Sequence, residues 1–525
     1  MSRGSANNLA SCQIGGLLLL VIIISSCQPI YLSREVRHTD QVSSINTKNK
    51  YIKAHMKDGQ LYILYNWYYD SAKNALAGWG NYLDVNRKLV DSRGNLVDAS
   101  KTEGIDPFII AIDNVALLET NDPGPSLATR LIIPTVVTAG FGVYCLTNPK
   151  ACFGSCPTYY ASNGDSMVLQ AEGFSESIAP SLEKNDIDML YWAKPSKDFE
   201  LKVTNEALET HAIRYMQLLA FDKNQGERVF AGSDGKFYRC SNLQPAQSTK
   251  GDKVLDQKLN SVDGKEYYSA ADENNLNSFE ELSFKFEASA GKDLGLVIAK
   301  RQTLLTTFLM YQGLAYMGAT AGHWLAKMET GNFSKGNHLF DLLGSIEVYV
   351  KDEKGTWIKQ GSIHETGPIA TDINIIPLTP MPNRNMEVKI RMNKGLWRID
   401  WLCLATITGM AEPERLMPYA AERIEGSEPA PLNKLLDPND YLVTLPGHEY
   451  RVRFMLPSEK VELFLDSKGY YLEWMRDEWM KEQSMAKLNT YINKPALYLK
   501  KAARDYKKVE ASMDKIFWES RYEKK

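Results

Sequence analysis

The sequence lacks a surplus of charge of either sign. Its 525 residues contain 61 Lys and Arg against 64 Asp and Glu, which gives a formal net charge of -3 at pH 7. A protein that binds nucleic acid through its phosphates needs a basic surplus, so nucleic acid is not expected as a partner. With 44% hydrophobic and 24% charged residues, the chain is instead expected to fold around a sizeable core.

The common motifs of catalysis and cofactor binding are also missing. The sequence contains no G-x-S-x-G elbow, no H-E-x-x-H zinc motif, no P-loop and no EF-hand calcium loop. We therefore expect no cofactor, and we favour a non-catalytic binding or scaffold protein. The alternative from another class is a glycan hydrolase, because its two carboxylates come together only in the folded chain and leave no local motif.

Cysteine is scarce, with seven in the whole chain, so a disulfide framework is not expected. Cys403 lies within an apolar run and is interpreted as a buried thiol. A bridge between Cys145 and Cys240 is conceivable, although a sequence does not fix which cysteines pair.

Only one uninterrupted aliphatic run is long enough to suggest a targeting signal, and it lies near the N-terminus. Residues 17–24 are eight consecutive aliphatic residues, whereas a helix that spans a membrane needs about 20. Residues 1–26 are therefore interpreted as a signal peptide rather than a retained transmembrane anchor. Residues 27–50, which follow it, are mostly polar and are interpreted as a tether.

The end of this signal, Ile24-Ser25-Ser26-Cys27, resembles the lipobox of bacterial lipoproteins. The resemblance implies that Cys27 becomes the mature N-terminus and carries the lipid, including palmitate, that anchors the protein to the membrane of the cell envelope. Gln28 stands where an inner-membrane retention signal has Asp, which favours the outer membrane by the same resemblance. The alternative is an ordinary secretory signal that is cleaved near Ser26.

From residue 51 onward, short strands dominate the pattern. Aromatic and β-branched residues recur between Asn, Asp and Gly turns, and strands do not alternate regularly with helices. We predict a mainly β protein with some α, built from two or more β-sandwich-like units. The expected parts are a β-rich domain at 51–245, a linking segment at 246–335, a β-sandwich-like domain at 336–480 and a helical segment at 481–525.

Two longer helices are predicted. Residues 302–326 contain no Asp, Glu, Lys or Arg, and we expect a buried central helix over 302–328, because its Thr, Gln and His side chains are too polar for a membrane span. The second helix begins at Pro495 and is amphipathic over about 26 residues. Packing against the body is favoured over a membrane-surface role, because acidic residues dilute its basic face.

The sequence Cys152-Phe153-Gly154-Ser155-Cys156-Pro157 is the most specific local motif. A disulfide between Cys152 and Cys156 is favoured, because an exported protein meets an oxidising compartment. A C-x3-C-P motif also resembles the Cu(I) site of Sco-type metallochaperones, but Asn163-Gly164 predicts a hairpin here and not the helix of that fold. Residues 152–174 resemble instead a small uncharacterised domain of envelope lipoproteins, and this resemblance implies no activity.

The densest cluster of possible metal ligands is Glu206, Glu209 and His211. A hydrogen-bonded histidine is favoured over a metal site, because no further ligand can be placed from elsewhere in the chain. Aromatic clusters at 65–69 and 470–474 could present rings to a glycan or to an envelope protein, although such rings are more often part of a core. The remaining expected partner is the membrane that holds the lipid anchor.

Overall fold

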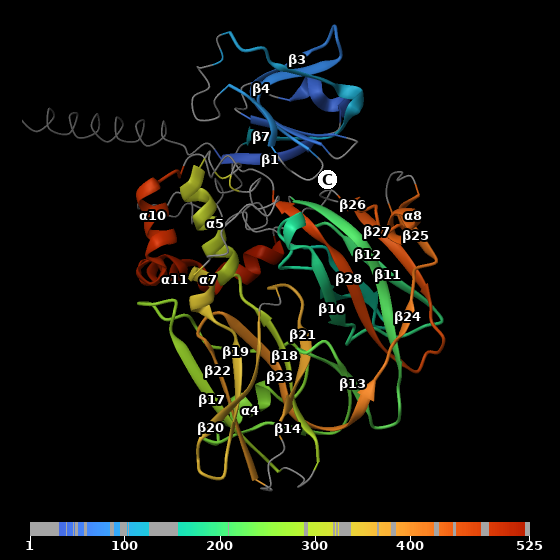
Figure 1. Cartoon of the computed structure of the whole chain (residues 1–525), viewed down its shortest axis with the longest axis vertical. Helices are drawn as coiled ribbons and strands as arrows, with labels where there is room; N and C mark the ends of the chain where they lie inside the picture. The colour runs from blue at the N-terminus through green and yellow to red at the C-terminus, as the bar shows by residue number, and fades with distance from the viewer. Residues whose placement is uncertain are drawn as a thin grey trace, which may run out of the picture.

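The computed structural model describes residues 31–124 and 156–519, apart from gaps at 38, 46, 48–50, 57–59, 85–88, 95–101, 103, 208, 288–291, 319–320, 322–323, 325–337, 365–366, 380–384, 425–429, 445–447 and 474–481. The chain is mainly β with a few helices, which confirms the predicted fold class. Figure 1 shows one sheet at the N-terminal end and a larger body made of the other sheets and the helices.

The N-terminal sheet is formed by residues 31–124. In spatial order its strands are β1 (Tyr31–Arg37), β7 (Val115–Gly124), β2 (Tyr51–Met56), β3 (Leu61–Asp70), β4 (Ala75–Leu83) and β5 (Leu89–Arg93), with β6 (Phe108–Ala111) beside β4. Two 3-10 turns, η1 (Thr39–Ser44) and η2 (Ile112–Asn114), accompany it. The described residues of its hydrophobic clusters all lie between Val42 and Leu118, so this sheet has a small core of its own.

The first sandwich consists of two five-stranded sheets. Its outer sheet has the order β25 (Ala420–Arg423), β27 (Glu449–Met455), β11 (Asp198–Thr204), β8 (Thr158–Ser162) and β9 (Met167–Glu172). Its inner sheet has the order β10 (Lys184–Met189), β28 (Val461–Glu473), β12 (Glu209–Asp222) and β24 (Glu414–Leu416), with β26 (Leu442–Thr444) beside β12. The turn η4 (Pro180–Leu182) and the helix α8 (Pro431–Leu436) lie in its connections. Phe199 and Tyr450 from the outer sheet pack with Leu218 and Leu463 from the inner sheet.

The second sandwich also has two sheets. Its inner sheet has the order β14 (Phe237–Pro245), β13 (Arg228–Gly232), β21 (Asp372–Leu378), β18 (Leu294–Gln302), β23 (Trp397–Ala411) and β16 (Tyr267–Tyr268). Its outer sheet has the order β15 (Gln247–Ser248), β17 (Phe279–Glu287), β22 (Asn385–Asn393), β19 (Ile346–Lys351) and β20 (Trp357–Ile363). The short helix α4 (Lys253–Lys258) follows β15. Strands β13 and β21 pair in parallel, whereas β18 pairs antiparallel with both β21 and β23, as β17 does with β22.

The two inner sheets pack against each other, so the body has four sheet layers. Alternate residues of β28 face different layers: Leu463 and Leu465 join the core of the first sandwich, and Phe464 joins the cluster between the inner sheets. Residues of β18 divide in the same way between the inter-sheet cluster and the core of the second sandwich. Because both faces of β18 are buried, its residues 294–299 form a continuous apolar run. The outer strand β22 alternates as expected, with Val388 and Ile390 in the core.

Strands that are distant in the sequence share sheets in this arrangement. The predicted unit 51–245 contributes strands to the N-terminal sheet, to both sheets of the first sandwich and to the second sandwich. The predicted unit 336–480 is likewise divided, because β24 to β28 return to the first sandwich and pair with strands from 158–222. Periodicity along the chain indicates strands but does not indicate which distant strand each one pairs with.

Helices cover one end of the second sandwich. Helix α5 (Leu305–Met317) is buried on most sides, as predicted, but it begins after residue 302, because Gln302 still pairs with Trp397 in the sheet. Helices α7 (His338–Leu343), α10 (Met485–Asn493) and α11 (Pro495–Glu519) pack beside it (Figure 1). Helix α11 has the predicted start, and its apolar stripe is buried against the body. Among the residues that the structure describes, no helix combines the length and the apolar composition that crossing a membrane requires.

Candidate functional site

A cavity of about 800 Å³ lies where the first sandwich meets the second sandwich and its helices. We call it the junction cavity. Residues near the ends of β9 and β28, together with the chain around η4, form the wall from the first sandwich. Helices α5 and α7, the end of β18 and the loop around Gly367 form the wall from the second. Clefts of this size between structural units are common places for small ligands.

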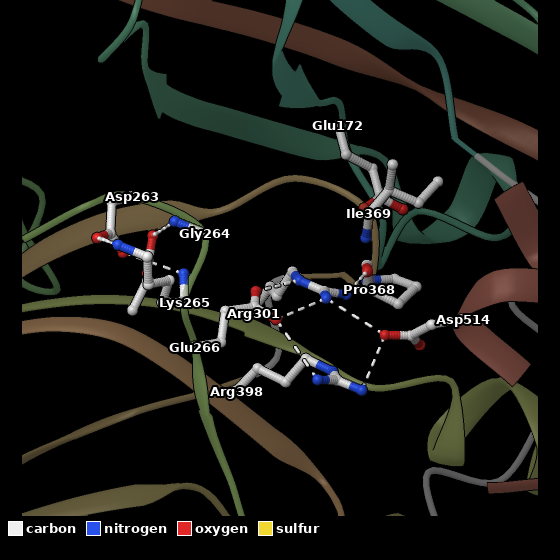
Figure 2. Close-up of polar contacts among 11 residues, drawn as sticks. Glu172, Asp263, Gly264, Lys265, Glu266, Arg301, Pro368, Ile369, Arg398 and Asp514 are labelled. Atoms are coloured by element: carbon white, nitrogen blue, oxygen red, sulfur yellow. Dashed lines mark hydrogen bonds and ion pairs between the residues drawn. The ribbon is translucent and has the colours of Figure 1, made fainter. Parts of the chain in front are cut away.

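Glu172, at the end of β9, is the most perturbed carboxyl group of this cavity. Its Oε2 atom accepts a hydrogen bond of 2.7 Å from the backbone N–H of Ile369, and Figure 2 shows the two residues side by side. Burial raises the pKa of Glu172 to about 7, against the opposing effect of backbone donors such as Ile369. Glu172 is therefore partly protonated near neutral pH.

The loop around Gly367 is shaped to receive this carboxyl group. Gly367 has a φ of +94°, and a Cβ atom on it would lie 2.7 Å from Oε2 of Glu172, so a larger residue would displace the carboxyl group. On its other side, the loop accepts a hydrogen bond of 2.9 Å at the Pro368 carbonyl from Arg301. Charged side chains of both sandwiches thus hold one loop of the cavity wall (Figure 2).

Glu473, at the end of β28, is a second carboxyl group in the cavity wall. It accepts a hydrogen bond from the hydroxyl of Tyr311 on α5, which joins the first sandwich to the helix. Tyr471, two residues earlier, also lines the cavity and donates from its hydroxyl to the carbonyl of Ser175 at 3.2 Å. The cavity wall therefore combines carboxyl groups with aromatic rings whose positions are fixed by hydrogen bonds.

Near Glu172, a group of charged side chains is buried between the two inner sheets. Lys300 on β18 is fully buried and lies 2.5 Å from Asp372 on β21. Burial raises the pKa of Asp186 on β10 to about 6, and the charge of Asp372 adds to this effect. Burial also raises the pKa of Asp188, and it lowers the pKa of Lys300. Because these groups come from both sandwiches, they couple the contact between the sandwiches to protonation.

A second group of ion pairs, shown in Figure 2, holds helix α11 to the inner sheet of the second sandwich. Arg301 pairs with Glu266 at 2.5 Å and with Asp514 of α11 at 3.3 Å. Arg398 also contacts Asp514, at 2.9 Å. Since α11 packs against α5 and α7, these ion pairs support the helices that form one wall of the cavity.

The predicted cluster of Glu206, Glu209 and His211 lies outside the residues that line the cavity. All three side chains are buried; Glu206 accepts a hydrogen bond of 2.7 Å from Tyr160, and His211 Nε2 lies 3.6 Å from Oε2 of Glu209. In the part of the chain that the structure describes, no three His, Cys, Asp or Glu side chains are grouped to hold a metal ion.

The structure describes only some of the cysteines about which the sequence made predictions. Cys27, Cys145 and Cys152 lie outside the described residues, so the lipid anchor and the Cys152–Cys156 disulfide stay predictions. Cys156 is a buried thiol in the cavity wall, and burial raises its pKa, which disfavours the thiolate that a copper site requires. The predicted hairpin after it is present, with β8 and β9 joined by a turn at Asn163 and Gly164. Cys240 and Cys403 are buried thiols.

The residues of this site were not identified from the sequence. Glu172 and Glu473 are the last residues of β9 and β28, and Lys300 follows the apolar run 294–299 of β18; these positions were the available signal. Of the aromatic clusters, Tyr471 lines the cavity, whereas Trp67 is part of the N-terminal core and Tyr68 is exposed.

Comparisons with known proteins do not assign this chain to a family. No protein-family model and no curated protein matches it. Among solved structures it is similar, with a TM-score of 0.16, to BuGH86wt in complex with neoagarooctaose, at 7% identity over 43% of this chain and 34% of that one. The same TM-score is found for BpGH86A, a β-porphyranase of glycoside hydrolase family 86 from the human gut bacterium Bacteroides plebeius, at 9% identity over 48% of this chain and 43% of that one.

A structure of infectious bursal disease virus Gt strain is similar with a TM-score of 0.13, at 10% identity over 70% of this chain and 91% of the other. The chain thus spans less than half of the two glycoside hydrolases. Similarities at these TM-scores carry no argument about fold or function, and the function must be argued from the cavity.

Proposed function

We propose that the protein is a lipid-anchored binding protein of the cell envelope that holds a glycan in the junction cavity. The observation that carries the binding function is the cavity itself, with its volume of about 800 Å³ between the two sandwiches. The residues that line it include the hydroxyl-bearing Thr306, Thr307 and Ser345, together with Tyr311 and Tyr471, whose rings are largely buried. Hydroxyl and carboxyl groups can form hydrogen bonds with the hydroxyl groups of a sugar, so such a lining suits a glycan.

The lipid anchor is the part of the proposal that rests on sequence alone. The run at 17–24 followed by Cys27 supports acylation, and Gln28 favours the outer membrane. Intact mass measurement of the protein extracted from membranes tests this part. The expected mass is that of a chain beginning at acylated Cys27, and an unmodified or uncleaved N-terminus would contradict it.

One observation favours a glycan hydrolase as a second candidate. Glu172 and Glu473 line the same cavity, and a buried carboxyl group with a pKa of about 7 can serve as a general acid at neutral pH. Against this role, Oε2 of Glu172 already accepts a hydrogen bond from the backbone of Ile369. We therefore favour binding without turnover.

The binding function is tested with a glycan array probed with the full chain in detergent. A Thr307→Trp variant, which places an indole in the cavity from α5, is expected to lose the glycans that the parent protein retains. The matched control is Thr356→Trp, at an exposed turn before β20 in the outer sheet of the second sandwich, and it is expected to bind normally. Retained binding by a folded Thr307→Trp variant would contradict the assignment to this cavity.

Turnover is tested by incubating retained glycans with the protein and measuring new reducing ends. The proposal predicts none beyond the rate without protein. Release that Glu473→Gln abolishes, with binding retained, would replace the proposal with the hydrolase.

A further inference from the structure

We propose that the corner between helices α10 and α11 docks on the surface of a bilayer that contains anionic phospholipid. We call residues 485–504 the helix corner, and Figure 1 shows both helices at one edge of the body. None of these residues, all of which the structure describes, lines the junction cavity. The inference therefore goes beyond the proposed function and does not depend on what the cavity binds.

The helix corner is strongly basic, although the charge of the whole chain is nearly balanced. Residues 483–504 contain four Lys and one Arg but no Asp or Glu. Four of these basic side chains are exposed: Lys494, Lys500, Lys501 and Arg504. Within the described part of the chain, none of the four has an ion-pair partner, whereas Asp505, the next acidic residue, pairs with Lys508 at 2.7 Å. The positive charge of the helix corner therefore faces solvent.

Exposed apolar side chains lie on both sides of the turn that joins the two helices. Ile492 is 51% exposed and Leu497 is 43% exposed, with Lys494 and Pro495 between them. Met485, which is 62% exposed, precedes Ile492 by seven residues and so lies on the same side of α10. Single exposed apolar residues are common on protein surfaces, but here three of them accompany the unpaired cations, which makes the surface both apolar and basic.

Packing of α11 holds its basic face outward. Leu497, Lys500 and Arg504 are spaced by three and four residues and therefore share one face of the helix. Leu499 and Tyr506 lie on the opposite face, where they are fully buried in the core of the second sandwich and its helices. The outward face is thus fixed by the fold and needs no rearrangement before it meets a partner.

A bilayer surface offers partners to both kinds of side chain. Anionic headgroups attract lysine and arginine, and exposed apolar side chains enter the boundary between headgroups and acyl chains. The phosphates of a nucleic acid would pair with the cations but would leave Ile492 and Leu497 in water. The proposed lipid on Cys27 would hold the protein beside such a surface, and docking of the helix corner would fix the orientation of the body on it.

The test measures whether the helix corner itself enters the lipid surface when the full chain is reconstituted in vesicles. Ala496→Cys places an exposed thiol at the corner for a fluorophore, and Thr356→Cys, at an exposed turn before β20, is the matched control. The parent protein, treated in the same way, gives the background from its own cysteines. In vesicles of equal parts phosphatidylglycerol and phosphatidylcholine, brominated acyl chains should quench the fluorophore at 496 but not at 356. Absent quenching at 496, or equal quenching at both positions, would overturn the proposal.

A charge variant distinguishes a basic contact from a purely apolar one. It carries the label at 496 and three substitutions: Lys494→Gln, Lys500→Gln and Lys501→Gln. Because each lysine near an anionic leaflet adds to the attraction, the ratio of docked to undocked protein should fall at least about tenfold. The matched control replaces three exposed lysines of the second sandwich and should keep its quenching: Lys253→Gln, Lys285→Gln and Lys354→Gln.

The lipid and the salt concentration are varied with the parent residues in place. Quenching at 496 should fall in vesicles of phosphatidylcholine alone and with added salt. Quenching that persists in both conditions and in the charge variant would contradict docking on anionic lipid. A spectral change at 496 that appears without vesicles and grows with protein concentration would replace the bilayer with a second copy of the chain.

Discussion

A glutamate in the junction cavity and a glutamate on the outer sheet of the second sandwich have pKa values that are shifted in opposite directions. In the cavity, burial raises the pKa of Glu172 to about 7. On the outer face, hydrogen bonds, first from Lys359 and then from Arg391, lower the pKa of Glu347 to about 2, although burial opposes them. The comparison shows that neighbours and solvent, rather than residue type, decide which carboxyl group holds a proton at neutral pH.

The two regions also differ in how their cations are placed. Lys300, near the cavity, is fully buried beside Asp372. On the outer face, Lys389 lies 4.9 Å from the ring centroid of Trp357 and 5.2 Å from that of Tyr349. The charges on the outer face are partly exposed and are therefore screened by solvent, whereas the buried group depends on every member being present.

The largest loss of stability is expected when the buried cation, Lys300, is removed. Lys300→Met leaves Asp372 buried next to Asp186 and Asp188 without its cationic partner, and should lower the free energy of unfolding by about 3 to 5 kcal/mol. Lys351→Met, which removes the exposed partner of Glu387, should cost at most about 1 kcal/mol. Urea denaturation of both variants measures the difference. Equal losses would show that the two regions do not differ as described.

The next effect is a pH dependence of stability. The folded-state pKa of Glu172 is about 7 against an ordinary value of 4.5, so its contribution is fully present below pH 4.5 and is lost as pH rises through 7. The loss should reach about 2 to 3 kcal/mol. Glu172→Gln should flatten this part of the profile, although Asp186 contributes in the same direction. Melting temperatures between pH 4 and pH 8 test this, and an unchanged slope in the variant would refute it.

Much of the architecture was predictable from the sequence, and the site was not. The Asn163-Gly164 turn and the amphipathic helix that begins at Pro495 are local patterns, and the structure confirms both. Glu172, Ile369 and Glu473 are far apart in the chain. Glu473 reaches the cavity on β28, which returns to pair with β12 and β10, and Ile369 reaches Glu172 from the loop before β21. No local periodicity encodes that pairing, which explains why the junction cavity could not be found in advance.

A smaller loss of stability is expected when the ion pairs of Asp514 on helix α11 are weakened. Asp514→Asn weakens the contacts to Arg301 and Arg398 and should lower stability by about 1 to 2 kcal/mol, because these groups are only partly exposed. The control Asp505→Asn affects an exposed pair with Lys508 on the same helix and should change stability by less than about 0.5 kcal/mol. Thermal unfolding compares the two, and a neutral Asp514→Asn would show that apolar packing alone holds the helix.

The smallest loss of stability is expected at Glu347, the partly exposed carboxylate of the outer face. Because the pKa of Glu347 is lowered in the folded state, its contribution is present above pH 4.5 and is lost as pH falls toward 2. Glu347→Gln should therefore cost at most about 1 kcal/mol at pH 7 and nothing at pH 2. This profile is opposite in sign to that of Glu172. Denaturation at the two pH values measures it, and a larger cost at pH 2 would reverse the assigned sign.

The most direct test of the central claim, that the junction cavity is the binding site, is amide hydrogen exchange of the full chain with and without a glycan that the array retains. The account predicts slower exchange in 305–317, 338–345 and 471–473, which supply the cavity wall. Exchange in β19, β20 and β22 should not change. Protection confined to those three strands would place the ligand on the outer face and contradict the claim.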